Sequence, residues 1–289
     1  MRVLLTGAAG FIGRHVLDAL APAEVHAVSR APQSARAGVT WHTADLLSAG
    51  AARALVRDVQ PTHLVHLAWT TAHGTYWHDP ANHDWVAASL ELLDAFAAGG
   101  GRHAFVAGTC AEDDWTGAGQ LPATRYGRCK AALRLLASDR AAMHGLPLAW
   151  GRVFFTFGPG ESAARLVPSL SLKLLAGHGA ATGPGELERD FVYVEDLAAM
   201  IALACRTGHD GAIDLCSGRG TCIGDLATAV SRETGRAELL QIGALPARAG
   251  DPARLVGNAD ALHAMGWCGG LGVEEGLRRS VAWWRENAA

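Results

Sequence analysis

Lysine is almost absent from this chain of 289 residues, in which Lys130 and Lys173 are the only two. Arginine therefore carries nearly all the positive charge. Lys and Arg number 25 against 28 Asp and Glu, which gives a formal net charge of −3 at pH 7. Because binding to a phosphate backbone requires a basic surplus, we do not expect a nucleic-acid partner. A lysine that persists in such a background is a weak indication of a specific role.

Cysteine is also scarce, with six residues and no C-x-x-C pair among them. This spacing argues against zinc sites and thioredoxin-like redox sites, so no metal is expected. A disulfide framework is not expected in a chain this long with so few cysteines. Reduced thiols, and with them a cytoplasmic location, are the favoured interpretation.

Long apolar runs are missing as well. No stretch approaches the roughly 20 residues that cross a bilayer, and residues 197–205 are expected to form a buried helix. The apolar start of the chain is interrupted by Gly7, Gly10 and Gly13, and no cleavage region follows. We therefore expect neither a signal peptide nor a membrane partner.

The residues that are present predict a large folded core, since 49% are hydrophobic and 18% are charged. Short aliphatic runs alternate with helical patterns, which predicts an α/β fold with a Rossmann-type, doubly wound, mainly parallel sheet. The expected strands are 3–5, 25–29, 63–67, 103–107 and 148–155, and the expected helices are 13–21, 51–59, 85–98 and 125–144.

This alternation weakens after Phe157, where Gly158-Pro159-Gly160 and Gly183-Pro184-Gly185 indicate turns. We expect a smaller, mixed C-terminal lobe that binds the substrate. The expected division is a dinucleotide-binding domain of 1–155 plus about 191–217, and a substrate lobe of 156–190 and 218–289.

A glycine-rich turn follows the first expected strand, between Leu4 and Gly13. Small residues let the backbone approach a pyrophosphate, and the N-terminus of the next helix supplies N–H groups and partial positive charge. The alternative is a tight turn that binds nothing. The strand–turn–helix context favours a dinucleotide site. Its residues would be Gly7, Gly10, Phe11, Ile12 and Gly13.

The end of the second expected strand indicates which dinucleotide binds. Sites for NAD usually place Asp or Glu there, whereas this chain has Ser29 and Arg30, which suit a 2′-phosphate. The sequence therefore favours NADP, with a solvated Arg30 as the alternative. Asp45 and Leu46 follow a further strand and are candidates for the adenine edge, although Asp45 also fits an ordinary loop residue.

Three further residues indicate chemistry at a hydroxyl or ketone. Tyr126 and Lys130 are four residues apart on one face of a helix, and Thr109 ends the preceding strand. A nearby ammonium lowers the pKa of a phenol from about 10, which prepares it for proton exchange. The pair alone is common, but the combination downstream of a dinucleotide turn is a strong pattern.

With these residues, the sequence resembles the extended short-chain dehydrogenase/reductase family, in particular its sugar-nucleotide epimerases, dehydratases and ketoreductases. The resemblance covers nearly the whole chain. It implies that Tyr126 is the acid/base, that Lys130 binds the nicotinamide ribose and lowers the pKa of Tyr126, and that Thr109 orients the reacting oxygen. The motifs that carry it are Thr6–Gly13, His66-Leu67-Ala68, Thr109, Tyr126, Lys130, Gly158-Pro159-Gly160 and Arg189–Asp196.

The same resemblance implies further contacts. Leu67, Ala68 and Trp69 would line the cofactor. Arg189 would contact the nucleotide diphosphate, as would Arg254 unless it is an ordinary surface arginine. The chain departs from the family pattern at Phe155 and Trp85, where Asn is common, and at Trp69, which is bulkier than usual. We include Phe155 among the expected substrate contacts.

Residues beside the catalytic ones indicate the reaction. Dehydratases resemble Thr-Asp-Glu at the strand end, whereas here Thr109 is followed by Cys110 and Ala111, so dehydration is disfavoured. The dual epimerase/reductase of the family has a Cys and a His where this chain has Ala111 and Arg165. Epimerisation at C3 or C5 is therefore not expected.

The expected function is NADPH-dependent reduction of a nucleoside-diphosphate 4-keto-6-deoxy sugar. A nucleotide-sugar 4-epimerase is the alternative, because it needs no further residues. A non-enzymatic NADP-binding regulatory or scaffold protein is a third possibility, which the intact Thr109, Tyr126 and Lys130 argue against. By resemblance, a homodimer through a four-helix interface of the 85–98 and 125–144 helices is expected.

Overall fold

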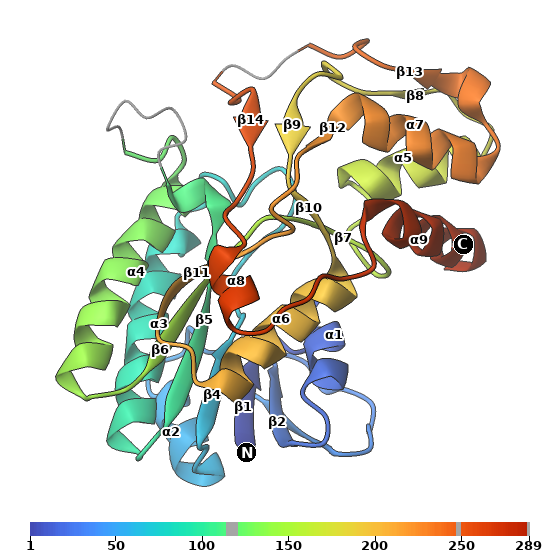
Figure 1. Cartoon of the computed structure of the whole chain (residues 1–289). Helices are drawn as coiled ribbons and strands as arrows, with labels where there is room; N and C mark the ends of the chain where they lie inside the picture. The colour runs from blue at the N-terminus through green and yellow to red at the C-terminus, as the bar shows by residue number, and fades with distance from the viewer. Residues whose placement is uncertain (114–120, 247–249, 288–289) are drawn as a thin grey trace. The chain divides into compact units, whose positions relative to one another are not determined.

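The computed structural model describes residues 1–113, 121–246 and 250–287 (Figure 1). The chain forms two units. The first comprises Met1–Val153, Ala198–Leu215 and Ala261–Trp267. The second comprises Phe154–Leu197, Cys216–Asp260 and the residues from Cys268 on.

The first unit is built on a seven-stranded sheet in which every neighbouring pair of strands is parallel. The order is β11-β6-β5-β4-β1-β2-β3. The chain builds outward from β1 on one side through β2 and β3, and on the other side through β4, β5 and β6. Ligands of such sheets bind outside the carboxyl ends of the strands at this reversal. The strands are β1 (Arg2–Thr6), β2 (Glu24–Ser29), β3 (Val39–Thr43), β4 (His63–His66), β5 (His103–Thr109), β6 (Leu148–Val153) and β11 (Gly211–Leu215).

Helices cover both faces of this sheet. On one face lie α2 (Ala51–Val59), α3 (Ala81–Ala98) and α4 (Arg125–Met143), and α3 and α4 run side by side (Figure 1). On the other lie α1 (Phe11–Ala19) and α6 (Val194–Thr207), where the Arg206 guanidinium donates to the Ala19 carbonyl. A single-turn helix η1 (Cys110–Glu112) follows β5, and α8 (Asp260–Ala264) is short.

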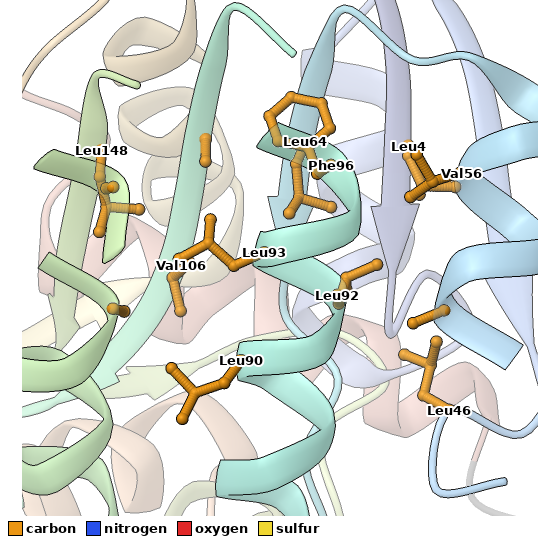
Figure 2. Close-up of a cluster of buried hydrophobic side chains, with 14 of the residues drawn as sticks. Leu4, Leu46, Val56, Leu64, Leu90, Leu92, Leu93, Phe96, Val106 and Leu148 are labelled. Atoms are coloured by element: carbon orange, nitrogen blue, oxygen red, sulfur yellow. The ribbon is translucent and has the colours of Figure 1, made fainter. Parts of the chain in front are cut away.

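The core beneath α2, α3 and α4 explains why these segments adopt their structures. Figure 2 shows Leu64 of β4 beside Phe96 and Val106 of β5 beside Leu93, and both partners belong to α3. Strands buried on both faces read as continuous apolar runs, which is the pattern of residues 3–5 in β1 and 104–107 in β5. Each fully buried side chain of this size contributes about 1.5–3 kcal/mol to folding. The core thus fixes the strands whose carboxyl ends carry the site.

The second unit has a smaller core and short strands of mixed direction. Its helices are α5 (Leu166–Leu175), α7 (Ile223–Thr234), the single turn η2 (Ala237–Leu239) and α9 (Val273–Asn287). Strands β7 (Phe155–Phe157) and β10 (Phe191–Tyr193) are parallel. A three-stranded group joins β12 (Thr221–Cys222), β9 (Glu188–Arg189) and β14 (Arg254–Leu255), and a pair joins β13 (Leu240–Gln241) and β8 (Ala180–Ala181). Phe157, Leu170 and Leu226 lie in the core of this unit.

The Rossmann-type α/β fold expected from the sequence is confirmed. The unit boundaries differ in detail from those expected. Residues 191–193 form β10, which pairs with β7 of the second unit, and residues 261–267 belong to the first unit. The strand expected at 148–155 ends at Val153, since Phe155 begins β7. Within the described residues, no helix is both long and apolar enough to span a membrane.

Candidate active site

The glycine turn lies between β1 and α1, where the backbone comes close to its neighbours. Gly7 has a φ of +71°, and a Cβ added there would lie 2.8 Å from the Ala68 nitrogen. A Cβ on Gly13 would lie 2.1 Å from the Gly7 carbonyl oxygen, so only glycine lets α1 pack this closely. Gly10 begins α1 with no side-chain cap. The turn therefore offers backbone N–H groups at a helix N-terminus without obstruction, which fits a dinucleotide pyrophosphate.

A buried polar chain fixes the backbone beside this turn. The Ala68 N–H donates to Thr6 Oγ1 (3.3 Å), and Thr6 Oγ1 lies 2.7 Å from His66 Nδ1. His66 Nε2 lies 2.8 Å from Ser89 Oγ, which donates to the Trp85 carbonyl. This order assigns the proton of His66 to Nε2. Burial, and next the charge of Lys130, lower the pKa of His66 to about 3, so the ring is neutral at neutral pH. This series of hydrogen bonds fixes the backbone of Leu67, Ala68 and Trp69 at the carboxyl end of β4.

The end of β2 carries Ser29, and the exposed Arg30 follows it. Ser29 Oγ accepts from the Ala31 N–H (3.3 Å) and from Gln33 Nε2 (3.2 Å). No Asp or Glu occurs between residues 29 and 37. Asp45 accepts from the Leu47 N–H (3.1 Å), whereas Leu46 is packed in the core and offers only its backbone to a ligand.

The three expected catalytic residues converge at the carboxyl end of β5. Thr109 is the last residue of β5, while Tyr126 and Lys130 lie on the first two turns of α4. The Thr124 hydroxyl caps α4 by accepting from the Gly127 N–H (3.1 Å). All three side chains are buried, with Thr109, Tyr126 and Lys130 exposed by 7%, 9% and 4%. The structure thus brings together the residues expected from the sequence.

The pKa of Tyr126 departs from the expected direction. Burial raises the pKa of the Tyr126 phenol well above its ordinary value, the hydrogen bond with the Thr109 side chain opposes this rise, and the nearby Tyr76 adds to it. The sequence led us to expect a phenol pKa lowered by Lys130. The phenol instead lies in a desolvated site where the charged form is disfavoured.

Lys130 is itself buried, and it is not among the groups that shift the pKa of Tyr126. The Lys130 Nζ donates to the Ala107 carbonyl oxygen (2.7 Å) and lies 3.8 Å from the centre of the Trp69 ring. Burial lowers the pKa of Lys130 to about 7, and the charge of Glu112 opposes this decrease. Lys130 is thus close to losing its proton at neutral pH.

Aromatic rings surround the phenol. Trp69, Tyr76 and Trp77 meet the Tyr126 ring edge-on, with centroids 6.3, 5.0 and 5.8 Å away. The Trp69 indole donates to Asn82 Oδ1 (2.7 Å), which fixes the ring that lies over Lys130. The sequence indicated Trp69 but neither Tyr76 nor Trp77, because nothing in their spacing links them to Tyr126.

Glu112 is a further buried residue, which the sequence did not indicate as part of the site. Its Oε2 accepts from the Thr109 N–H (3.1 Å), its Oε1 accepts from the Trp150 indole (2.8 Å), and Arg134 Nε lies 3.2 Å from Oε1. Burial is the main cause that raises the pKa of this carboxyl. The signal that could have found it is the capping box Thr-x-x-Glu from Thr109 to Glu112.

The expected diphosphate contacts lie in the second unit. Arg189 donates to the carbonyls of Glu188 and Pro252 (both 2.8 Å), and its guanidinium lies 5.6 Å from the Phe155 ring. Arg254 pairs with Glu188 (2.7 Å) and is largely exposed. Phe155, Arg189 and Arg254 therefore lie close to one another at β9. Among the described residues, no group of three or more His, Cys, Asp or Glu side chains could hold a metal ion.

Comparison with known proteins identifies the family. The model of the NAD dependent epimerase/dehydratase family matches residues 3–215. The UDP-glucose 4-epimerase of Azospirillum brasilense is 28% identical over 99% of this chain and 92% of its own length. The UDP-glucose 4-epimerase of Thermus thermophilus, solved in complex with NAD, superposes with a TM-score of 0.87 at 26% identity, covering 99% of this chain and 100% of that chain.

A third relative is much longer. The trifunctional UDP-glucose 4,6-dehydratase/UDP-4-keto-6-deoxy-D-glucose 3,5-epimerase/UDP-4-keto-L-rhamnose-reductase of Arabidopsis thaliana is 26% identical over 58% of this chain. The match spans only 26% of that protein. The family match and the shared fold together place this chain in the NAD-dependent epimerase/dehydratase family, a branch of the extended short-chain dehydrogenases/reductases.

Proposed function

We propose that this chain is a nucleotide-sugar 4-epimerase, which inverts the configuration of the 4-hydroxyl of a nucleoside-diphosphate hexose by oxidising C4 to a ketone and reducing it again from the other face. The observation that carries the proposal is the buried cluster of Thr109, Tyr126 and Lys130 beside an unobstructed dinucleotide turn. Two relatives that match nearly the full chain act, by name, as UDP-glucose 4-epimerases.

The chain's own residues account for the proton transfers. A nicotinamide dinucleotide, held by Gly7, Gly10 and Gly13, would supply the hydride acceptor and donor. Tyr126 would take the proton of the 4-hydroxyl and later return it, while the Thr109 hydroxyl orients that oxygen. Burial favours the neutral phenol, which suits Tyr126 to the return of a proton to the 4-keto oxygen. The first half of the reaction, in which Tyr126 takes the proton of the 4-hydroxyl, requires the phenolate. The neutral His66 and the Ala68 backbone would hold the cofactor side of the site in place.

Inversion at C4 requires no other acid or base, and the neighbouring residues supply none. Glu112 is occupied by Thr109, Trp150 and Arg134, which argues against the proton abstraction that dehydration requires. Ala111 has no titratable group, and Arg165 is a poor base because it remains protonated. The proposed reaction therefore leaves C3 and C5 unchanged.

One observation favours a second candidate, the NADPH-dependent reduction of a 4-keto-6-deoxy sugar. The β2 end offers Ser29 and Arg30 and lacks the carboxylate that usually holds the ribose hydroxyls of NAD. An NADP site suits a dinucleotide that dissociates after each turnover. In this reaction Tyr126 would donate its proton to the ketone oxygen.

The proposal includes two binding partners, a nucleotide-sugar substrate and a second copy of the chain. Arg189 and Arg254 would contact the diphosphate of the substrate. A second copy of the chain would pack on α3 and α4, where the α4 residues Leu135 and Met143 are exposed by 68% and 78%. We expect the protein to work in the cytoplasm.

A panel assay tests the proposal. The purified protein is incubated with UDP- and dTDP-linked hexoses without added cofactor, and separately with 4-keto-6-deoxy sugar nucleotides and NADPH. C4 inversion without added cofactor supports the epimerase, and NADPH consumption with formation of a 4-hydroxy sugar supports the reductase. Absence of both reactions across the panel would contradict the proposed chemistry. NAD or NADP released on denaturing the protein identifies the bound dinucleotide.

A further inference from the structure

The Trp69 ring lies against the ammonium of Lys130, and the proposed reaction gives this ring no role. The Lys130 Nζ lies 3.8 Å from the centre of the Trp69 ring and donates to the Ala107 carbonyl oxygen (2.7 Å). Neither partner carries a formal charge. Because Lys130 is buried, these two contacts take the place of water around its ammonium.

An aromatic face is a suitable partner for a buried cation. The negative face of the ring attracts an ammonium, Trp is the best of the aromatic side chains in this role, and the attraction grows where water is excluded. An aliphatic side chain at position 69 would bury the Lys130 ammonium without this attraction. Burial by itself disfavours the charged form of a lysine. The Trp69 face therefore opposes the loss of the Lys130 proton that burial favours.

Hydrogen bonds and ring packing hold the Trp69 indole in this position. Its N–H donates to Asn82 Oδ1 (2.7 Å), and the Asn82 amide donates to the carbonyls of Tyr76 and Asp79 (both 2.8 Å). The Trp69 ring also stacks on the ring of Trp85, with the centroids 6.0 Å apart and the planes at 26°. Asn82 and Trp85 both lie on α3, so this helix fixes the indole against the lysine of α4.

We propose that Trp69 is a positioning residue that stabilises the Lys130 ammonium through its ring face and leaves one ammonium N–H for a bound dinucleotide. An ammonium has three N–H groups. One donates to the Ala107 carbonyl, and the Trp69 face occupies a second direction. The third remains for a ribose hydroxyl. The role of Trp69 in dinucleotide binding rests on the proposed function, but its effect on the Lys130 ammonium does not.

Lysine NMR of the wild type tests the contact directly, because the chain has only Lys130 and Lys173. Protein labelled with ¹³C at the lysine ε-carbon gives signals from two residues, which the Lys173→Arg variant assigns. Protons that lie over an indole face are shielded by its ring current, so at acidic pH the ε-protons of Lys130 should lie upfield of those of Lys173. Absence of this upfield displacement would overturn the proposal, and the measurement requires no substitution of Trp69.

A pair of substitutions separates the ring face from volume and hydrogen bonding. Trp69→Phe and Trp69→Leu both remove the hydrogen bond to Asn82 and both reduce the volume of the side chain, but only Phe keeps an aromatic face. The pH midpoint of the Lys130 signal should be lower in Trp69→Leu than in Trp69→Phe by about half a pH unit or more. Equal midpoints in the two folded variants would overturn the proposal.

The other titratable groups around Lys130 are identical in this pair of variants. They are Glu112 of η1, His66 of β4 and Tyr126 of α4. The control is Trp77→Leu, which removes an aromatic ring that meets Tyr126 edge-on at 5.8 Å. This variant should leave the Lys130 midpoint unchanged. A decrease equal to that in Trp69→Leu would overturn a specific effect of the Trp69 face.

Dinucleotide binding tests the consequence for the site. NAD and NADP are titrated into Trp69→Phe and Trp69→Leu by calorimetry at pH 5.5 and pH 7. At pH 5.5 Lys130 is largely protonated in both variants and the affinities should be nearly equal, whereas at pH 7 Trp69→Leu should bind about two- to threefold more weakly. An affinity ratio that is the same at both pH values would overturn the effect on binding. Wild-type protein that binds neither dinucleotide would refute the proposed function and leave the Lys130 results standing.

Discussion

The glycine turn and the buried cluster of Thr109, Glu112, Tyr126 and Lys130 lie at the same edge of one sheet but are built in opposite ways. The turn presents backbone groups, and it has no room for side chains, because a Cβ at Gly7 or Gly13 would collide with neighbouring backbone atoms. The cluster uses buried polar side chains, among them Glu112 and Lys130, whose pKa values are shifted by burial. The first region therefore tolerates little added volume, and the second tolerates little change in charge.

The largest expected effect is in the cluster. Tyr126→Phe keeps the ring and its aromatic contacts but removes the proton donor, so kcat should fall by about 10²–10⁴. Dinucleotide affinity should remain close to that of the wild type, because the turn is untouched. Steady-state kinetics measures the change in kcat, and a fluorescence titration measures the dinucleotide affinity. Near-normal turnover in this variant would remove Tyr126 from the proposed chemistry.

The turn should respond to volume. Gly13→Ala places a Cβ 2.1 Å from the Gly7 carbonyl oxygen, so α1 must shift. We expect the free energy of unfolding to fall by about 1–3 kcal/mol, with weaker dinucleotide binding. Urea denaturation measures the change. Gly183→Ala is the control, since the nearest atom to its added Cβ is 3.8 Å away; an equal loss there would refute a specific packing constraint at Gly13.

Dinucleotide choice should depend on Arg30, the exposed residue that follows β2. If NADP is preferred, NADPH should bind at least about tenfold tighter than NADH, which corresponds to about 1.4 kcal/mol. Arg30→Ala should abolish most of that difference and leave NADH binding nearly unchanged. Titrations of the wild type and the variant with both dinucleotides decide the question. Equal or tighter binding of NADH by the wild type contradicts the preference.

A smaller effect concerns stability and pH. The pKa of Lys130 is about 7 in the folded chain against an ordinary value of 10.5. Between these values the unfolded chain binds more protons than the folded chain, so stability should rise as pH increases from 7 to 10.5. Lys130→Met removes this cost at low pH and should raise Tm at pH 6 by about 2–4 °C while abolishing turnover.

Thermal unfolding from pH 6 to pH 10 checks this prediction. The advantage of Lys130→Met over the wild type should be greatest at pH 6 and shrink as pH rises. Lys173→Arg, on α5, keeps its charge and serves as the control. A Lys130→Met variant less stable than the wild type at pH 6 would show that the Ala107 and Trp69 contacts outweigh the cost of burial.

The same comparison explains what the sequence could predict. The turn is contiguous, so the spacing of Gly7, Gly10 and Gly13 after a strand predicts it. Tyr126 and Lys130 share a helix face, and Thr109 ends a strand, so periodicity brings them to one edge of the sheet. The fold follows from the same alternation of strands and helices.

The remainder of the cluster depends on packing between distant segments. Trp150 meets Glu112 only because β5 and β6 are neighbours in the sheet and Gly108 leaves room between them. The direction of the Tyr126 pKa shift depends on burial by Tyr76 and Trp77, which no local pattern reports. The expected lowering by Lys130 was wrong for the same reason, since helix spacing gives proximity but not solvation.

Deuterium placed at C4 tests the central claim most directly. Wild-type protein and Tyr126→Phe are incubated with UDP- and dTDP-linked hexoses carrying ²H at C4, without added cofactor, and the products are examined by NMR. The account predicts a C4-inverted product from the wild type that keeps deuterium at C4, and at least about a hundredfold slower formation by Tyr126→Phe. Inverted product that has lost its C4 deuterium to solvent, or equal rates in the two proteins, would contradict it.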